Sequence, residues 1–259
     1  MEVVAVITNA EEKGFREFLI PSCDHYNLRL TILEHSHTYY HTHRIKDALL
    51  QEYLEFVNDE EIILFSDGND AVFLADEDEI MEKFKLFEAP LVFSAEVNCW
   101  PSGSIKNKYP HSTYHFKYLN SGGFIGKAGY IRKLYAEFPV RTAGFDSRYP
   151  WSNQYYWHYV YLQHSGEIRL DHECKIFYNT STRMKNIKGI NFKDTGDPRI
   201  GELYDAELQR LEKEILFSDH RIHNKLTGTQ PCHLHFAGPI SKRVMNSGGF
   251  DRLKAWNEV

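Results

Sequence analysis

The stretch IILFSDGNDAVFL, residues 62–74, ends an apolar run with two carboxylates, Asp67 and Asp70, before a second apolar run begins. Two carboxylates that a strand-end turn holds three residues apart repel each other unless a cation lies between them. Mg²⁺ and Mn²⁺ take oxygen ligands and often keep phosphate oxygens as partners, and Gly68 permits close approach of the backbone. The stretch therefore indicates a divalent-metal site, with an Asx-turn and a helix cap as the alternative.

Strand-like and helical segments alternate around this stretch. This alternation predicts an α/β fold with a mostly parallel sheet flanked by helices. Ligands of such sheets bind beyond the carboxyl ends of the strands, which is where Asp67 and Asp70 stand. The predicted strands span 2–8, 28–34, 61–65 and 91–96, and the predicted helices span 12–23, 44–57 and 76–87.

The second half of the chain is less regular. The residues Asn120, Ser121, Gly122 and Gly123 are predicted to form a tight loop, because glycines let backbone N–H groups approach a ligand closely. No linker rich in Pro, Gly or Ser interrupts the chain, so we expect a single domain over 1–259. The predicted helices here span 127–138, 152–164, 203–213 and 250–258, and the predicted short strands span 168–171, 175–179, 214–218, 220–224 and 232–236.

Composition excludes several classes of protein. The net charge of −6 and the lack of a long basic stripe disfavour a nucleic-acid partner. The N-terminus has no leader pattern and no apolar run approaches the ~20 residues that span a bilayer, so we expect a cytoplasmic protein with no membrane partner. Aromatic residues make up 14% of the chain, which suits carbohydrate contact as well as an aromatic core.

The four cysteines, Cys23, Cys99, Cys174 and Cys232, lie far apart and show no CxxC spacing. We expect buried free thiols rather than a zinc site or a disulfide scaffold.

Several further motifs follow at characteristic intervals. They are VITNAEEKGFREFL (6–19), SDGNDAVF (66–73), SAEVNCWP (94–101), LNSGGFIG (119–126), LDHECKIFYN (170–179) and HLHFAGP (233–239). In this order they resemble the glycosyltransferase domain of the procollagen lysyl hydroxylases, over most of the chain.

The resemblance implies a GT-A type, Rossmann-like fold that uses a UDP-sugar and Mn²⁺, with Mg²⁺ as the alternative cation. It implies a nucleotide-binding half at about 1–100 and an acceptor-side half at about 101–259. The family's metal ligands correspond to Asp67, Asp70 and His235, and Mn²⁺ accepts imidazole as well as oxygen. The residues expected to contact the sugar and to take part in catalysis are Trp100, Asn120 and Gln154, with the metal acids Asp67 and Asp70.

The resemblance also places the nucleotide. Arg44 and Lys46 are assigned to the diphosphate, because both can donate charge-assisted hydrogen bonds to phosphate oxygens. The alternative is that both side chains form the solvated face of a first helical turn. Asn69 stands where the family usually carries an aromatic residue, so stacking on uracil is expected from Tyr39 or Tyr40. The remaining residues assigned to the donor are Ile7, Thr8 and Asn9 for uridine, and Gly122, Gly123 and Gly238.

The chain departs from the family in three places. In YPWSNQYY (149–156), Ser152 and Asn153 replace an acidic run and only Gln154 is kept, with Asp146 and Asp171 as candidates to compensate. HFAGP replaces the H-G-N-G-P pattern beside His235, and the segment 185–213 is longer than its counterpart. The run HSHTYYHTH (35–43) offers His35, His37, His41 and His43 to zinc, but it lacks an acid or cysteine at ligand spacing and fits a flexible loop over the nucleotide better.

The implied activity is transfer of glucose from UDP-glucose to galactosyl-hydroxylysine of a collagen-like polypeptide, with retention of configuration. The alternatives are galactose transfer to hydroxylysine and a catalytically weak UDP-sugar-binding protein. An aspartate-nucleophile phosphatase would need a DxD motif and a later Lys and acidic pair in order, and we cannot place that series in this sequence. A homodimer is left open.

Overall fold

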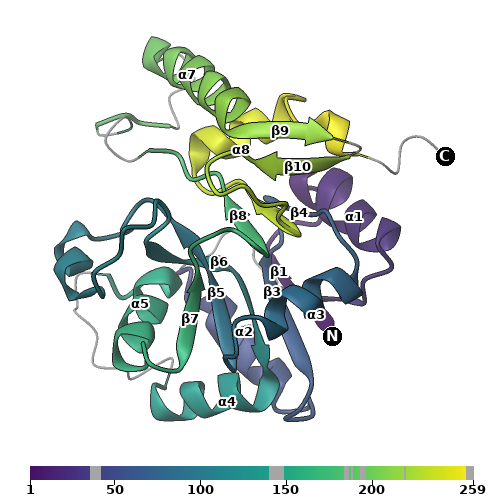
Figure 1. Cartoon of the computed structure of the whole chain (residues 1–259), viewed down its shortest axis with the longest axis vertical. Coiled ribbons are helices and arrows are strands. Elements are labelled where there is room, and N and C mark those ends of the chain that lie inside the picture. The colour runs from purple at the N-terminus through teal and green to yellow at the C-terminus, as the bar shows by residue number, and fades with distance from the viewer. Residues whose placement is uncertain are drawn as a thin grey trace.

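A six-stranded sheet with the strand order β2-β1-β3-β6-β5-β7 forms the centre of the computed structural model (Figure 1). Five strands run parallel to one another, and β6 runs antiparallel between β3 and β5. The mostly parallel α/β architecture predicted from the sequence is confirmed. The structure describes residues 1–35, 42–139, 149–183, 187, 189–192, 197–218 and 220–254. The strands are β1 (Glu2–Ile7), β2 (Leu30–Glu34), β3 (Ile62–Asp67), β5 (Leu91–Glu96), β6 (Tyr118–Lys127) and β7 (Ile168–Asp171).

Some sequence predictions concern residues outside the described part of the chain. These are the stacking role of Tyr39 or Tyr40, the compensating role of Asp146, and most of the histidine run, including His37 and His41.

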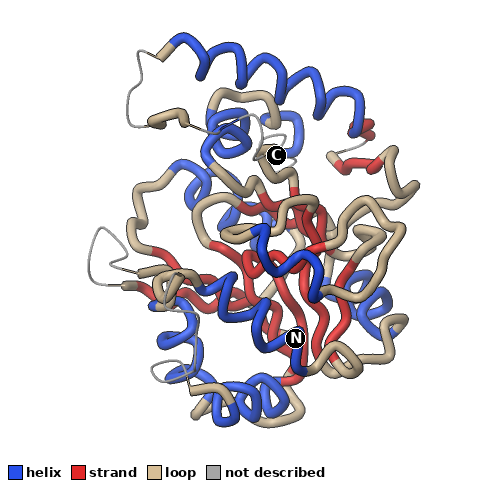
Figure 2. Tube along the Cα trace, turned by 90° about the vertical axis from the view of Figure 1, so that its left-hand side faces the viewer, coloured by secondary structure: helices blue, strands red, loops and turns tan. Residues whose placement is uncertain are grey.

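Helices cover both faces of this sheet (Figure 2). Side chains alternate between the two faces along a strand, so Val4 and Val6 of β1 pack into one core while Val3, Ala5 and Ile7 pack into the other. The first core contains side chains of α2 (Ile45–Leu54), α4 (Ala128–Glu137) and α5 (Asn153–Gln163), and the second contains those of α1 (Ile20–His25), the π-helical turn before it (Phe15–Leu19) and α3 (Glu77–Lys85).

A second, three-stranded sheet joins distant parts of the chain. In it β11 (His233–His235) pairs antiparallel with β4 (Ala71–Phe73) and parallel with β8 (Phe177–Asn179). Because β4 begins directly after Asp70, its pairing with β11 brings the end of β11 next to the carboxylates. Above this sheet in Figure 1 lie α7 (Pro198–Glu214), α8 (Pro239–Asn246) and the hairpin of β9 (Ile215–Ser218) and β10 (Arg221–Asn224).

The prediction of a tight loop at 120–123 was wrong. Asn120, Ser121, Gly122 and Gly123 lie inside β6, at the irregularity where its pairing with β5 shifts register. The glycines are present because neighbouring side chains occupy the space that a Cβ atom would need. A Cβ on Gly122 would lie 2.1 Å from the His235 ring.

Other elements also differ from the sequence prediction. The strand β4, the 3₁₀ turn Gly103–Lys108 and the helix α8 were not predicted, and α7 begins at Pro198 rather than at 203. Of the tail helix expected at 250–258, the described residues show a 3₁₀ turn at Asp251–Leu253. The four cysteines are free and buried, as predicted. Within the described ranges, no helix has the length and apolar character needed to cross a membrane.

Candidate metal and nucleotide-sugar site

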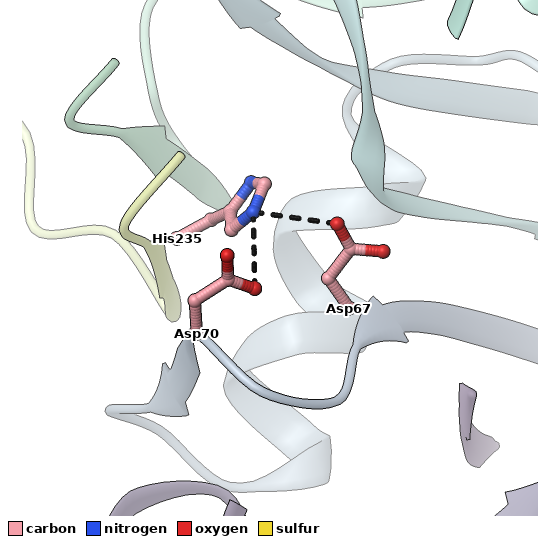
Figure 3. Close-up of side chains that lie close together, drawn as sticks. All are labelled: Asp67, Asp70 and His235. Atoms are coloured by element: carbon pink, nitrogen blue, oxygen red, sulfur yellow. Dashed lines mark ion pairs between the residues drawn. The ribbon is translucent and has the colours of Figure 1, made fainter. Parts of the chain in front are cut away.

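Asp67, Asp70 and His235 converge at one point although the sequence separates them widely (Figure 3). The Nε2 atom of His235 lies 3.5 Å from Oδ2 of Asp67 and 3.5 Å from Oδ1 of Asp70. One ligand atom from each residue lies within 4.8 Å of the others. Asp67 ends β3, Asp70 precedes β4, and His235 ends β11, so the meeting of the two sheets creates the cluster.

Each carboxylate of the cluster also faces a lysine. Lys46 pairs with Oδ1 of Asp67, and Lys242 lies 3.0 Å from Oδ2 of Asp70. On each carboxylate the lysine therefore contacts a different oxygen from the one that forms the ion pair with Nε2 of His235. The two inner oxygens and the imidazole nitrogen form a donor set of the kind that Mn²⁺ and Mg²⁺ accept, so these residues fit a divalent cation.

The pKa values reflect this concentration of charge. Burial opposes ionisation of Asp70, but Lys242 and His235 outweigh it and hold the pKa of Asp70 well below its usual range. Burial also opposes the charged form of His235, and Asp70 and Asp67 raise its pKa in spite of that. The carboxylate of Asp70 raises the pKa of Lys242. The carboxylate of Asp70 is thus ionised at neutral pH, the form that binds a cation.

A cavity of about 610 Å³ opens beside the cluster, which lies in the size range of small-molecule sites. Thr8 after β1, Asp67 at the end of β3 and Glu96 at the end of β5 all line it. The cavity therefore lies at the carboxyl ends of parallel strands, as expected for a sheet of this class. Other predicted residues that line it are Lys46, Asn69, Asp70, Trp100, Asn120, Gly122, Gln154, His235 and Gly238.

Four residues assigned to the donor are not among those lining this cavity. The Arg44 guanidinium bonds to Asp47 at 3.0 Å and lies 4.2 Å from the centre of the Tyr156 ring. Asn9 accepts a hydrogen bond from the backbone of Glu11. Ile7 is buried in the core, and the missing Cβ of Gly123 faces Phe177 and His233. Their contacts to the nucleotide stay predictions.

Glu96 is a cavity residue that the sequence prediction missed. Its Oε1 accepts hydrogen bonds from the side-chain amides of Asn120 at 3.0 Å and Gln154 at 2.6 Å, and its Oε2 accepts from Ser181 at 2.6 Å. Burial raises its pKa, although these three donors oppose the shift. No cation of the described residues forms an ion pair with Glu96. The signal that could have found it is its position at a strand end, inside SAEVNCWP.

Two further outcomes concern Lys242 and Asp171. Lys242 was missed because α8, which carries it, was not predicted. Asp171 does not take the place of the lost acids at the cavity, because its carboxylate accepts backbone N–H groups of Lys175, Ile176 and Phe177 in the turn before β8. Burial raises the pKa of Asp171 to about 6.

An acid–imidazole cluster beside a cavity at the carboxyl ends of parallel strands is the arrangement expected of a metal-dependent enzyme of the α/β class. The family model described as PLOD GT domain matches residues 1–258, and the chain belongs to this family of glycosyltransferase domains.

Among curated proteins, mouse procollagen-lysine,2-oxoglutarate 5-dioxygenase 2 is 30% identical over 188 residues, covering 68% of this chain and 24% of the relative. Cattle procollagen-lysine,2-oxoglutarate 5-dioxygenase 1 is 35% identical over 149 residues, covering 55% of this chain and 20% of the relative. An uncharacterized protein, R699, of Acanthamoeba polyphaga mimivirus is 24% identical over 199 residues, covering 76% of this chain and 36% of the relative. The chain thus spans about a quarter of the length of the first curated relatives that it matches.

Among solved structures, the galactosyltransferase LgtC with donor and acceptor sugar analogues has a TM-score of 0.47 at 10% identity, covering 99% of this chain and 96% of that chain. A glycosyltransferase involved in glycosylation of the major capsid of PBCV-1 has a TM-score of 0.49 at 10% identity, covering 95% and 97%. Both likenesses are distant.

Proposed function

We propose that this glycosyltransferase domain moves glucose from UDP-glucose to galactosyl-hydroxylysine of a collagen-like polypeptide, with retention of configuration and with Mn²⁺ as cofactor. The observation that supports the proposal best is the convergence of Asp67, Asp70 and His235 beside the cavity. The collagen-like acceptor rests on the printed names of the relatives, which are procollagen-lysine enzymes.

In this proposal Asp67, Asp70 and His235 hold the cation, which supplies charge neutralisation for the departing UDP. Lys46 and Lys242 lie at the outer oxygens of the same carboxylates. They are therefore placed to donate charge-assisted hydrogen bonds to phosphate oxygens that enter the cavity. Thr8, Asn69 and Gly238 line the cavity and are assigned to the nucleotide half of the donor.

The sugar half is assigned to the side of the cavity that carries Glu96, Trp100, Asn120 and Gln154. The two amides hold the Glu96 carboxylate in one orientation. Among the described residues Glu96 is hydrogen-bonded only by neutral groups, and its carboxyl group is assigned to the sugar half of the donor. Transfer with retention needs no strong base aimed at the acceptor, so replacement of the family's acids by Ser152 and Asn153 is compatible with turnover.

The decisive experiment measures UDP release from a panel of UDP-sugars, including UDP-glucose and UDP-galactose, with and without Mn²⁺. Asp67→Ala and His235→Ala are expected to abolish the Mn²⁺-dependent release. Asp78→Ala and His25→Ala, which remove the same groups from exposed positions, are matched controls and are expected to behave like the wild type. Full turnover by Asp67→Ala would end the proposal, and preference for UDP-galactose would favour transfer to hydroxylysine.

A second candidate is a catalytically weak UDP-sugar-binding protein. Ser152 and Asn153 favour it, because they stand where the family carries acids. Calorimetry would then show binding of UDP-glucose in the presence of Mn²⁺, and the same preparation would consume none. The cytoplasmic location, the single-domain organisation with its two halves, and a homodimer belong to this proposal as expectations.

A further inference from the structure

Two hydroxyl groups of α8 and its C-terminal cap join this helix to α7, which lies above it in Figure 1. The hydroxyl of Ser241, in the first turn of α8, lies 2.8 Å from Oε1 of Glu207. The hydroxyl of Ser247, directly after α8, lies 2.6 Å from the hydroxyl of Tyr204. Tyr204 and Glu207 are about one turn apart on α7, so one face of α7 contacts both ends of α8.

The carboxylate of Glu207 is buried and is held by a guanidinium. Arg210 donates to its two oxygens, through Nη2 at 2.6 Å and through Nε at 3.1 Å, and also pairs with Glu214. Nη2 of Arg210 donates as well to the backbone oxygen of Thr180 at 3.1 Å. The Ser241 hydroxyl lies 2.6 Å from that same oxygen, so Glu207 and Thr180 form one acceptor site for Ser241. Because contacts to all of its side-chain nitrogens fix the guanidinium, this site has a defined geometry.

Ser241 connects this buried site to the wall of the cavity. The side chain of Ser241 is itself fully buried, and its backbone N–H donates to the hydroxyl of Thr182 at 3.1 Å. Thr182 lines the cavity, and so does Lys242, the next residue of α8 after Ser241. The Nζ atom of Lys242 lies 3.0 Å from Oδ2 of Asp70. The place of Lys242 in the cavity therefore depends on where Ser241 is held.

We propose that Glu207 of α7 is a positioning residue for the donor, because through Ser241 it fixes the first turn of α8 and thereby places Lys242 for the diphosphate. The inference rests on the proposed function, in which Lys242 donates to phosphate oxygens. Glu207 is not among the residues that line the cavity, so it acts through Ser241 and not on the ligand. A hydrogen bond to a charged acceptor is stronger than one between neutral groups, which suits this contact to hold α8 while a phosphate attracts the lysine.

Calorimetric titration of UDP in the presence of Mn²⁺, with urea unfolding of the same preparations, tests this role without requiring turnover. Ser241→Ala is expected to raise the dissociation constant of UDP about threefold to tenfold, the range for loss of one hydrogen bond. Ser247→Ala is the matched control, because it also removes a hydroxyl between α8 and α7 but at the end away from Lys242. It is expected to bind UDP like the wild type. Both variants are expected to lower the midpoint of urea unfolding, so a loss of stability alone does not separate them.

A double-mutant cycle tests whether Glu207 acts through Ser241. Glu207→Ala is expected to weaken UDP binding in the wild-type background and to add little to the effect of Ser241→Ala. Glu207→Gln keeps an oxygen that can accept from Ser241, and it is expected to restore most of the UDP affinity that Glu207→Ala loses. If Glu207→Ala does not fold, the comparison of Ser241→Ala with Ser247→Ala still decides the proposal.

The positioning role is overturned if Ser241→Ala binds UDP as tightly as the wild type. It is also overturned if Ser241→Ala and Ser247→Ala weaken UDP binding equally, because the contact would then only support the fold, or if the effects of Glu207→Ala and Ser241→Ala add in full. In each of these results the wild type binds UDP, so the proposed donor stands. A wild type that binds no UDP would instead contradict the proposed donor, and the positioning role with it.

Discussion

Replacing Gly122 by alanine is expected to disable the candidate metal site without replacing any of the residues proposed to bind the cation. A Cβ atom at this position would lie 2.1 Å from Cε1 of His235, 2.5 Å from Nδ1 and 2.9 Å from Nε2. Gly122 lies between Asn120, which pairs with Ser94 of β5, and Gly123, which pairs with Ser66 of β3. Its own N–H donates to Oδ1 of Asn120 at 2.9 Å, so the pairing on either side limits how far its backbone can retreat. The imidazole must move instead.

The required movement can be worked out from ordinary contact distances. Carbon atoms approach to about 3.5 Å without repulsion, so the ring must recede by roughly 3.5 − 2.1 = 1.4 Å from the new methyl group. Metal–ligand distances tolerate only about 0.2 Å, so the displaced His235 stops being a ligand. We expect Mn²⁺ affinity to fall at least ~10-fold, the scale on which misplaced ligands act. We also expect overpacking to cost about 1–3 kcal/mol of unfolding free energy.

The assay is calorimetric titration of Mn²⁺ in the presence of UDP, with urea unfolding on the same preparations. Gly201→Ala makes the same chemical change in α7, where nothing lies within 4 Å of the new methyl group. It is expected to leave Mn²⁺ binding unchanged and to stabilise the protein by about 0.5–1 kcal/mol, since alanine favours helix over glycine. Wild-type Mn²⁺ affinity in a folded Gly122→Ala protein would refute the reasoning.

Two predictions concern buried groups of the core. Asp47→Ala removes the carboxylate that accepts from Arg44 at 3.0 Å and from Trp157 at 2.9 Å, and breaking this buried ion pair is expected to cost about 3–5 kcal/mol in urea unfolding. A loss below about 1 kcal/mol would contradict this. Burial lowers the pKa of His158 to about 4, so the unfolded chain binds more protons between pH 4 and about 6.5, and stability falls as pH drops through this window. Between pH 7 and pH 5, His158 should account for about 2 kcal/mol of the lost free energy of unfolding. The measurement is the loss of unfolding free energy of the wild type minus that of His158→Gln. Equal losses in the two proteins would refute the assignment.

The alternation of strand-like and helical segments was sufficient to predict β1, β2, β3 and β5 of the central sheet, but not β6 between them. The runs that became β1 and β5 are almost entirely buried, and strands buried on both faces are apolar throughout. The carboxylates were predictable for the same reason, because a charged pair directly after such a run must lie at a sheet end. His235 was assigned only through the family resemblance, since its partners are more than 160 positions away in the sequence.

The rest of the site depends on tertiary packing that no local pattern encodes. The glycines of NSGGF resemble those of a loop, but Gly122 and Gly123 are required by the side chains of His235 and Phe177 from the other sheet. Glu96 looks like an ordinary acid at a strand end until Asn120, Gln154 and Ser181 are seen around it. These relations become visible only when both sheets are in place.

The charge around the cluster gives a physical reason why these residues belong together. Without a ligand, the negative charges of Asp67 and Asp70 are balanced by Lys46 and Lys242. A divalent cation bound between the carboxylates leaves an excess of two positive charges, with His235 neutral as a ligand. Each phosphate of a nucleoside diphosphate sugar carries one negative charge, so the donor would restore neutrality in a partly buried site. Since an uncompensated charge is costly there, cation and diphosphate should each bind more tightly when the other is present, and calorimetric titration of UDP with and without Mn²⁺ measures that coupling directly.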